Sequence, residues 1–364
     1  MNLWRRSRER VATKIEVGVL GATGTVGQEL IQLLDQHPWF QVTWLAASER
    51  SRGQRYGDLA WTLPGKVPAG VANQRVEPPW PRGAPHMVFS ALDPAAAGEA
   101  EPAFAAAGHY VVSNARNFRM DPLVPLLVPE VNAQHLDLVE IQQQKKRWSG
   151  AIVTSPDCST VFLAVVLGAL REFQVKRVLV TTLQALSGTD CRGVASVDAA
   201  ADVIPCVDGE EHNIETETQK ILGRLVVDSI VPDPVQISAQ AARVPVFHGH
   251  TEMVSLELDE RVSSEQVREA FQEFSSSAHA LHLPSAPAKP ILVHEERDRP
   301  KSHLDAESGR GMLVHVGRLR KCSVLGHKFV VLGHNLIRGA AGAAVLNAEL
   351  IVARSLFAPA QRLP

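Results

Sequence analysis

The sequence contains little cysteine for its length: Cys158, Cys191, Cys206 and Cys322 are the four cysteines in 364 residues. No two of them form a C-x-x-C pair, and no histidine pair has zinc-finger spacing. So large a chain with so few cysteines is not a disulfide scaffold. We therefore expect a reducing, cytoplasmic setting and predict no metal site.

The sequence also lacks an excess of charge of either sign and lacks a long apolar run. It has 37 basic and 39 acidic side chains, which give a net charge of -2. Nucleic acids and anionic membranes require a clustered basic face, so we expect neither as a partner. The longest apolar run, residues 161–170, is too short to span a bilayer and predicts a buried helix. The polar N-terminal residues 1–14 do not resemble a signal peptide.

The first part of the chain alternates strand-like and helix-like segments, which predicts β-α-β units and a parallel sheet. Ligands bind such sheets at the carboxyl ends of the strands. We expect strands over 15–20, 41–47, 87–92 and 110–113, and helices over 25–37 and 94–107.

The pattern changes after Cys158. Strand-like runs with fewer helices between them indicate a mixed or antiparallel sheet. The Ala-rich tail predicts a helix that returns to the first domain. We expect strands over 177–184, 251–258, 291–294, 312–318 and 328–331, with an amphipathic helix over 263–275.

A glycine-rich loop, GATGTVG at 21–27, lies between the first predicted strand and helix. Gly21 permits a tight turn, Gly24 lets a pyrophosphate approach the backbone, and Gly27 lets the helix pack closely on the strand. The N–H groups of the first helical turn then bind the anion. The prediction is an α/β protein: a Rossmann-type dinucleotide-binding domain over 1–156, completed by a C-terminal helix at 335–364, and an α+β domain with a mixed sheet over 157–334.

The end of the second strand, Ser48-Glu49-Arg50-Ser51-Arg52, bears on which dinucleotide binds. An acidic residue there favours the ribose hydroxyl of NAD, whereas arginine and serine favour the 2′-phosphate of NADP. Both types are present, and Arg50 with Ser51 favours NADP.

Cys158 is the candidate nucleophile. Residues 151–163 predict a strand, a turn broken by Pro156, and a helix with Asp157 as its N-cap. The helix dipole at that position stabilises a thiolate, which can form a thioester with an acyl substrate. The alternative is a buried cysteine with no chemical role.

A histidine should act as the partner base, and the segment RVPVFHGHTE at 243–252 offers two. His250 follows Gly249 and has the less crowded backbone, whereas His248 is the candidate for a structural role. Arg243 can bind a carboxylate through two hydrogen bonds.

Taken together, these segments resemble the aspartate-semialdehyde dehydrogenase family, in particular its archaeal and fungal branch. The resemblance runs from about Ile15 to Glu349. It is carried by GATGTVG at 21–27, SNARNFRMDPLVPLLVPEVN at 113–132, SPDCST at 155–160, QALSG at 184–188, GEEHNIETETQKILG at 209–223, RVPVFHGHTE at 243–252 and NLIRGAAGAA at 335–344.

The resemblance implies reductive dephosphorylation of β-aspartyl phosphate with NADPH. Cys158 then resembles the nucleophile, His250 the acid/base that activates the thiol, and Gln184 the residue that orients the acyl group. Arg243 resembles the ligand of the substrate carboxylate and Glu217 that of its amine, while Lys220 and Arg119 resemble phosphate ligands. The implied NADP contacts are Gly21, Thr23, Gly24, Thr25, Val26, Ser48, Arg50, Ser51, Ser187, Gly188 and Asn335. The second domain implies a homodimer or homotetramer.

Two departures from the family leave the substrate open. Asp157 stands where the family usually has asparagine, and its carboxylate should raise the pKa of the thiol. The segment SGTDCRG at 187–193 stands where the family normally has SGAGYPG, so that Thr189-Asp190-Cys191-Arg192 is the altered part. One alternative is a paralogue that reduces another acyl phosphate or an acyl-CoA, as malonyl-CoA reductases do. Another is a non-catalytic relative that only binds nucleotide.

Overall fold

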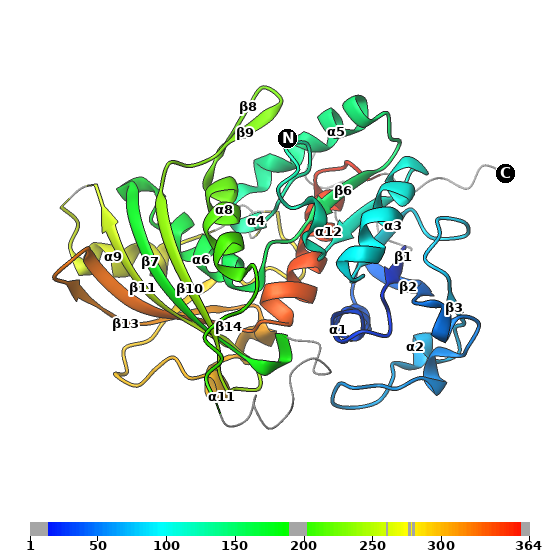
Figure 1. The fold of residues 1–364 in the computed structure, drawn as a ribbon, viewed down its shortest axis with the longest axis horizontal. Helices are drawn as coiled ribbons and strands as arrows, with labels where there is room; N and C mark the ends of the chain where they lie inside the picture. The colour runs from blue at the N-terminus through cyan, green and yellow to red at the C-terminus, as the bar shows by residue number, and fades with distance from the viewer. Residues whose placement is uncertain (1–13, 189–201, 260, 276–277, 279–280, 358–364) are drawn as a thin grey trace.

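The computed structural model describes residues 14–188, 202–259, 261–275, 278 and 281–357. Two β-sheets lie toward opposite ends of the molecule, with helices between and around them (Figure 1). Within the described residues, no helix is both long enough and apolar enough to cross a membrane.

The first sheet is the parallel sheet that the sequence predicts. In the described part of the chain it has six strands, in the order β3-β2-β1-β4-β5-β6. Its strands are β1 (Ile15–Leu20), β2 (Phe40–Ala46), β3 (Val76–Glu77), β4 (Met87–Ser90), β5 (Tyr110–Ser113) and β6 (Ala151–Thr154). Strands β4, β5 and β6 are almost wholly buried, as expected for a parallel sheet covered on both faces.

The helices of this part include α1, which follows the glycine-rich loop. They are α1 (Thr25–Leu34), α2 (Ala69–Ala72), α3 (Pro94–Ala106), α4 (Pro129–Asn132) and α5 (Leu138–Lys146). Helix α1 ends three residues before the predicted end at His37, because Asp35 has extended backbone angles and Gln36 has a positive φ of 61°.

The second sheet is mixed, as predicted. Its order over the described residues is β10-β7-β11-β14-β13-β12, with parallel pairs at both edges and antiparallel pairs between them. Its strands are β7 (Val175–Gln184), β10 (Gln236–Arg243), β11 (His250–Leu258), β12 (Ile291–Val293), β13 (Val314–Cys322) and β14 (Gly326–Gly333). Strand β10 is absent from the sequence prediction, because QISAQAAR has little of the β-branched character that marks a strand.

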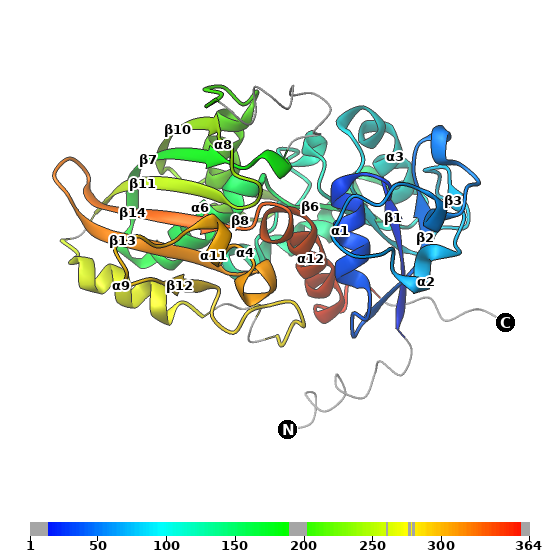
Figure 2. The same cartoon turned by 90° about the horizontal axis from the view of Figure 1, so that it is seen from below.

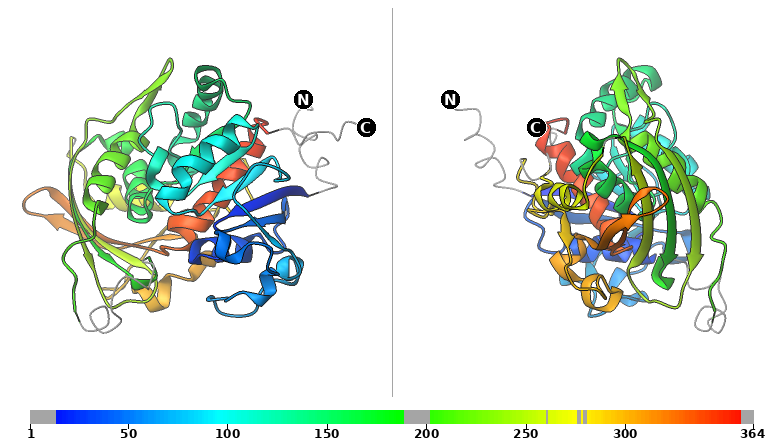
Figure 3. Two further views of the ribbon diagram at one scale, coloured as in Figure 1. Left: turned by 45° about the vertical axis from the view of Figure 1, so that its right-hand side comes forward. Right: turned by 90° about the vertical axis from the view of Figure 1, so that its left-hand side faces the viewer.

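Helices cover one face of the second sheet (Figure 3). They are α6 (Cys158–Ala169), α8 (Glu210–Leu222) and α9 (Ser264–Glu273). Residues 159–167 of α6 are all buried, which confirms the buried helix predicted from the apolar run. Leu179 of β7 and Met253 of β11 lie on the other face and are 50% and 52% exposed. β8 (Arg224–Val226) and β9 (Ser229–Val231) form a separate hairpin, and α11 (Ser302–Asp305) precedes β13.

The C-terminal helix is shorter than the predicted 335–364. A π-helical turn, η8 (Ile337–Ala341), leads into α12 (Gly342–Ala353), and Ser355 has a positive φ of 58° that ends the helical path. Residues 358–364 lie outside the described residues. Helix α12 lies between the two sheets and beside α1 (Figure 2). The domain boundaries at 1–156 and 157–334 stay a prediction.

Candidate active site

Cys158 is the first residue of α6, directly after the turn that follows β6. Asp157 caps the helix, since its Oδ1 accepts a hydrogen bond of 3.0 Å from the N–H of Ser159. The same Oδ1 lies 3.8 Å from the Cys158 Sγ, which donates to it. Gly339 in η8 packs against the cysteine so closely that a Cβ there would lie 2.5 Å from the Cys158 Cβ. The local sequence therefore produces the predicted strand, turn and helix. The η8 segment, which is remote in the sequence, packs against Cys158 through Gly339.

The surroundings of Cys158 favour the thiol over the thiolate. Loss of water around the sulfur raises its pKa well above the usual value, and the carboxyl groups of Asp157 and Glu210 raise it further. Arg119 and the N–H of Ser159 oppose this shift only in part. The low pKa expected from the helix dipole is therefore corrected: two neighbouring carboxyl groups and desolvation outweigh the dipole.

Ala185, at the end of β7, joins the predicted base to the predicted carboxylate ligand. Its N–H donates to the Nδ1 of His250 at 2.9 Å, and its carbonyl accepts from the Nη1 of Arg243 at 2.8 Å. Arg243 ends β10 and His250 begins β11, and both strands flank β7. The sheet register therefore brings together two residues that the sequence places in one short segment.

The hydrogen bond from Ala185 determines the tautomer of His250. Because Nδ1 accepts that bond, the neutral ring carries its hydrogen on Nε2. Among the described residues, this buried Nε2 has no hydrogen-bond partner. Burial, with Arg243 and His334 nearby, lowers the pKa of His250 to about 3. The ring is neutral, and its Nε2–H remains free to donate to a substrate oxygen.

The other histidine of the segment, His248, has different contacts. Its ring stacks on His334 with 5.0 Å between centroids, and its Nδ1 lies 2.9 Å from the Ser187 Oγ. That hydroxyl also accepts from the Nδ2 of Asn335 at 2.9 Å, and the Asn335 Oδ1 accepts from the N–H of Gly249. Ser187 and Asn335, two of the predicted cofactor contacts, are thereby brought together from remote parts of the chain. Gly188 ends the turn that contains Ser187, η6 (Leu186–Gly188).

Gln184 connects the end of β7 to the start of α6 and α8. Its Nε2 donates to the Oε2 of Glu210 at 3.0 Å and to the Oγ of Ser159 at 3.3 Å. Gln184 therefore contacts Ser159, the residue that follows the nucleophile Cys158 in the chain. Its predicted role in orienting the acyl group stays a prediction.

Arg119 and Glu217, predicted to bind phosphate and amine respectively, pair with each other. The Arg119 Nη1 donates to the Glu217 Oε1 at 3.0 Å, and the Glu217 Oε2 accepts from the backbone N–H of Asp157 at 2.7 Å. Arg119 also lies 3.9 Å from the Asp157 Oδ2. The pair therefore lies immediately beside the cysteine turn. The substrate roles of both residues stay predictions.

Lys220 lies on the same helix as Glu217, but its ammonium is fully engaged. Its Nζ donates to the carbonyl oxygens of Arg119, Asp121 and Val124 at 2.6, 2.9 and 2.9 Å. An ammonium has three hydrogens, so no donor is left for a phosphate in this arrangement. Burial lowers the pKa of Lys220 to about 8. What the structure shows is a lysine that holds the 119–124 loop, and its role as a phosphate ligand stays a prediction.

The glycine-rich loop has the shape that a dinucleotide requires. Gly21 has a φ of +75°, and a Cβ there would lie 2.4 Å from the carbonyl oxygen of Ala91. A Cβ on Gly27 would lie 2.2 Å from the Gly21 oxygen, so α1 packs directly on the turn. No side chain caps the start of α1, which leaves its first N–H groups available to an anion. The predicted contacts Thr23, Gly24, Thr25 and Val26 all retain exposed surface here.

The residues predicted to distinguish NADP from NAD follow β2. Ser48 precedes a short 3-10 turn, η1 (Glu49–Ser51), and Arg50 is exposed on that turn. The Glu49 Oε2 lies 3.3 Å from the Arg52 Nη1, and this ion pair partly offsets the negative charge of Glu49. The departures Thr189, Asp190, Cys191 and Arg192 lie outside the described residues.

Comparisons with known proteins agree with this arrangement. Residues 16–139 match the family model described as semialdehyde dehydrogenase, NAD binding domain, and residues 167–338 match semialdehyde dehydrogenase, dimerisation domain. An aspartate-semialdehyde dehydrogenase of Archaeoglobus fulgidus is 45% identical over 346 residues, which cover 94% of this chain and 100% of that protein. The chain belongs to the aspartate-semialdehyde dehydrogenase family.

Solved structures place this family member in the same fold. The crystal structure of aspartate semialdehyde dehydrogenase with NADP from Candida albicans has a TM-score of 0.87 and 39% identity, covering 95% of this chain and all of that one. A malonyl CoA reductase (NADP) of Metallosphaera sedula is also similar, with 36% identity over 93% of this chain and 97% of that protein. The archaeal and fungal resemblance read from the sequence is confirmed.

Sequence reasoning missed two acids near the cysteine turn, one half-buried and one fully buried. Glu210 accepts from Gln184 beside the cysteine turn. Glu252 of β11 is fully buried, and in the described part of the chain neither of its oxygens has a hydrogen-bond partner. In the sequence, Glu210 is typical of the acidic first turn of a helix, and Glu252 resembles an ordinary strand residue. Only their position next to Asp157 distinguishes them.

One group of possible metal ligands occurs among the described residues: His294, Asp305 and His315. Its carboxylate is already occupied, because Asp305 accepts hydrogen bonds from the Nε of Arg299 at 2.9 Å and from the N–H of Lys301 at 2.6 Å. The prediction of no metal stays a prediction.

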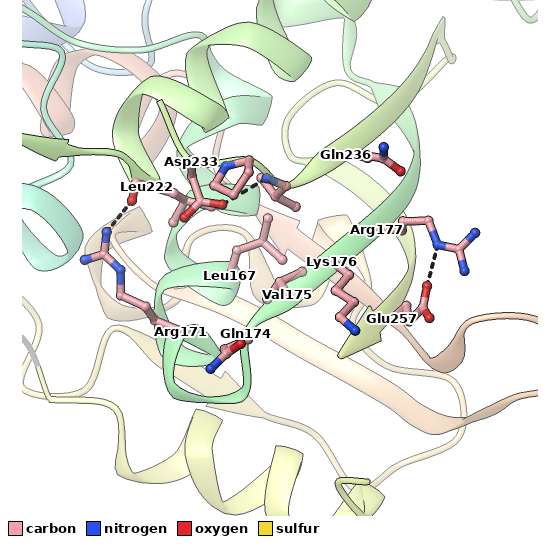
Figure 4. Close-up of a pocket in the computed structure, with 12 residues that line it drawn as sticks. Leu167, Arg171, Gln174, Val175, Lys176, Arg177, Leu222, Asp233, Gln236 and Glu257 are labelled. Atoms are coloured by element: carbon pink, nitrogen blue, oxygen red, sulfur yellow. Dashed lines mark hydrogen bonds and ion pairs between the residues drawn. The ribbon is translucent and has the colours of Figure 1, made fainter. Parts of the chain in front are cut away.

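A pocket of about 560 Å³ lies at the opposite end of α6 from the cysteine (Figure 4). Leu167 and Arg171 line it, together with the ion pair between Arg177 and Glu257. Because α6 has 12 residues, this pocket is about 16 Å from Cys158. It is separate from the site that contains the nucleophile.

Proposed function

We propose that the protein is an NADP-dependent aspartate-semialdehyde dehydrogenase, which converts L-aspartyl-4-phosphate to L-aspartate-4-semialdehyde through a thioester on Cys158. The observation that carries this proposal is the convergence of Cys158, Gln184, Arg243 and His250 from α6, β7, β10 and β11. An acyl-transferring thiol, a neutral imidazole donor and a cation for a carboxylate are the groups that this chemistry requires.

Each residue has a definite task in this proposal. The Cys158 thiol gives up its proton as the sulfur attacks the acyl carbon, and the bond from that carbon to the phosphate oxygen breaks, so that the proton leaves with the phosphate. NADPH, when bound at the glycine-rich loop, would supply the hydride for reduction of the thioester. The Nε2–H of His250 donates to the oxygen on which negative charge develops, and Arg243 pairs with the substrate carboxylate. Return of a proton to the sulfur accompanies release of the aldehyde.

The glycine-rich loop supports a dinucleotide cofactor, because Gly21 and Gly27 lie too close to neighbouring backbone for any side chain and thereby allow the tight turn before α1. Arg50 would contact the 2′-phosphate. Arg50→Ala should therefore raise the KM for NADP by about tenfold, the effect of losing one charge-assisted contact, and leave the KM for NAD almost unchanged. An equal change for both cofactors would contradict the assignment.

The test of the activity is the phosphate-dependent oxidation of L-aspartate-4-semialdehyde with NADP, followed as NADPH absorbance. Wild type should turn over, and Cys158→Ala should not. Turnover of malonyl-CoA but not of the semialdehyde would support the acyl-CoA alternative. If the folded protein binds NADP but turns over neither substrate, the result would support the alternative of a non-catalytic relative. A catalytic thiol functions in a reducing compartment, which supports a cytoplasmic location for this enzyme.

We further propose a homodimer formed through the open face of the second sheet. Leu179 and Met253 expose apolar surface at the middle of that face, where a partner sheet would bury it. Leu179→Lys combined with Met253→Lys should shift the mass measured by light scattering from dimer to monomer. Val227→Lys, at an exposed turn 89% accessible to solvent, is the matched control. A double variant that remains dimeric would refute this interface.

A further inference from the structure

Four carboxyl groups gather around the turn that contains Cys158. Asp157 comes from the turn itself, Glu210 and Glu217 from α8, and Glu252 from β11. Arg119 is the cation beside them. So many acids around one thiol cannot all be ionised at neutral pH, because like charges at short range and low solvent exposure disfavour the charged forms. The question is which of them hold protons.

Glu217 is a hydrogen-bond acceptor in this cluster. Both of its oxygens receive N–H donors, one from Arg119 and one from the backbone of Asp157. Burial raises the pKa of this carboxyl, whereas Arg119 and the two donors favour its ionised form. Because both oxygens are already engaged, Glu217 is not the partner with which Asp157 shares a proton.

Glu252 is neutral for the opposite reason. It is fully buried, and among the described residues its oxygens have no hydrogen-bond partner. Burial and the nearby Asp157 raise its pKa well above the usual value. Its carboxyl therefore favours the protonated form, and no hydrogen bond in the described residues links it to the cysteine turn.

Asp157 and Glu210 remain. The Asp157 Oδ1 is 3.8 Å from the Cys158 Sγ, and Gln184 holds the Glu210 carboxyl beside that of Asp157. Burial and contact with Asp157 raise the pKa of Glu210 to about 8. The charged and titratable groups that face this pair are Cys158 on α6, Arg119 on the turn after β5, Glu217 on α8 and Glu252 on β11.

We propose that Asp157 and Glu210 share one proton beside Cys158, and that this proton allows the thiol to ionise and an anionic substrate to approach. When the pair loses it, two carboxylates face the sulfur and Arg119, so both the thiolate and an acyl phosphate are repelled. A protonated carboxyl presents one donor and one acceptor, so Asp157 can hold the shared proton and still accept from the N–H of Ser159. Glu210 is then a positioning residue that acts through Asp157.

The thiol part of this proposal is independent of the substrate, whereas the acyl phosphate part rests on the proposed function. The first experiment is therefore the rate of alkylation of Cys158 by iodoacetamide as a function of pH, read by mass spectrometry of the peptide that contains it. The variants are Asp157→Asn, Glu210→Gln and the double substitution. Asparagine caps a helix as well as aspartate does, and glutamine keeps an acceptor for Gln184, so both should fold. Asp208→Asn, an exposed acid near the start of α8, is the matched control.

In this experiment, each single variant should alkylate about tenfold faster than wild type above about pH 8, which corresponds to one pKa unit of the thiol. The double variant should gain about the product of the two above that pH, because each substitution removes one of the two carboxylate charges that face the sulfur there. Asp208→Asn should follow wild type. Folded single variants that follow the wild-type profile would overturn the proposal, and so would a shift in Asp157→Asn without one in Glu210→Gln.

Wild type alone also tests the proposal, should either variant fail to fold. Its logarithmic alkylation rate should rise with pH, flatten near about pH 8 as the pair ionises, and then rise again. A uniform slope of about one through this range would overturn the proposal. In the kinetic assay, the KM for phosphate should climb above that pH in wild type and stay flat in Glu210→Gln. A wild-type protein without semialdehyde activity would contradict the proposed function. The alkylation profile would still show whether Asp157 and Glu210 share a proton.

Discussion

Lys220→Met is the substitution that best separates a structural lysine from a phosphate ligand. The Nζ donates to three carbonyl oxygens on the 119–124 loop, and two of those bonds are buried. Methionine fills a similar volume but leaves the carbonyls without a donor. Each buried acceptor left unsatisfied costs about 1–3 kcal/mol, so we expect a loss of about 3 kcal/mol in the free energy of unfolding.

This loss can be read as a melting temperature. An unfolding entropy of about 2.1 cal/mol/K per residue gives about 0.8 kcal/mol/K for a chain of 364 residues. The Tm of Lys220→Met should therefore fall by about 4 °C in differential scanning calorimetry. Lys176→Met is the control, since that lysine is half exposed in its pair with Asp259 and should change the Tm by under about 1 °C.

The opposite result would refute the structural interpretation. A Lys220→Met protein that melts like wild type, with a KM for phosphate raised by tenfold or more, would show that the ammonium binds phosphate and that its bonds to the loop add little. Loss of stability together with a moderate rise in the KM for phosphate is what a displaced Arg119 loop would produce.

Two further predictions concern packing and ionisation. Gly339→Ala should lower the free energy of unfolding by about 1–3 kcal/mol and reduce kcat, because the new Cβ would lie 2.5 Å from that of Cys158. Gly70→Ala, where a Cβ meets nothing within 4 Å, should change neither quantity. Equal melting temperatures for the two variants would contradict the predicted contact. Burial raises the pKa of Glu101 to about 7, so the folded state binds more protons than the unfolded state between about pH 4.5 and 7, and stability falls as pH rises through that range. Glu101→Gln should therefore gain about 2–3 kcal/mol over wild type near pH 8 and little near pH 4.5 in urea titrations, whereas Glu99→Gln, on the exposed side of the same helix, should match wild type at both.

Much of the fold follows from local pattern. The glycine-rich loop, the alternation of strands with helices and the apolar run of α6 each depend on residues close together in the chain, and the structure shows all three. Strand β10 could not be predicted in this way. Its residues form a strand because they add to the edge of β7 along eight register pairs, a long-range gain that its own composition does not reveal.

In the candidate site, too, some features follow from local sequence and others depend on long-range contacts. The sequence by itself determined which residue types are present: a cysteine at a helix start, two histidines before a strand, and a glycine-rich turn for a dinucleotide. It also indicated that Asp157 would oppose a low thiol pKa, and the structure agrees. These inferences needed only residue chemistry and spacing of a few positions.

Only the tertiary structure decided what state those residues are in. The tautomer of His250 depends on an N–H 65 residues away, and the three hydrogens of Lys220 are taken by carbonyls 96 to 101 residues away. Burial and partners brought together by the fold control whether a group is charged and which donors are free. Residue type and local spacing are enough to identify a candidate nucleophile. The protonation states of the groups around it depend on neighbours that are distant in the sequence.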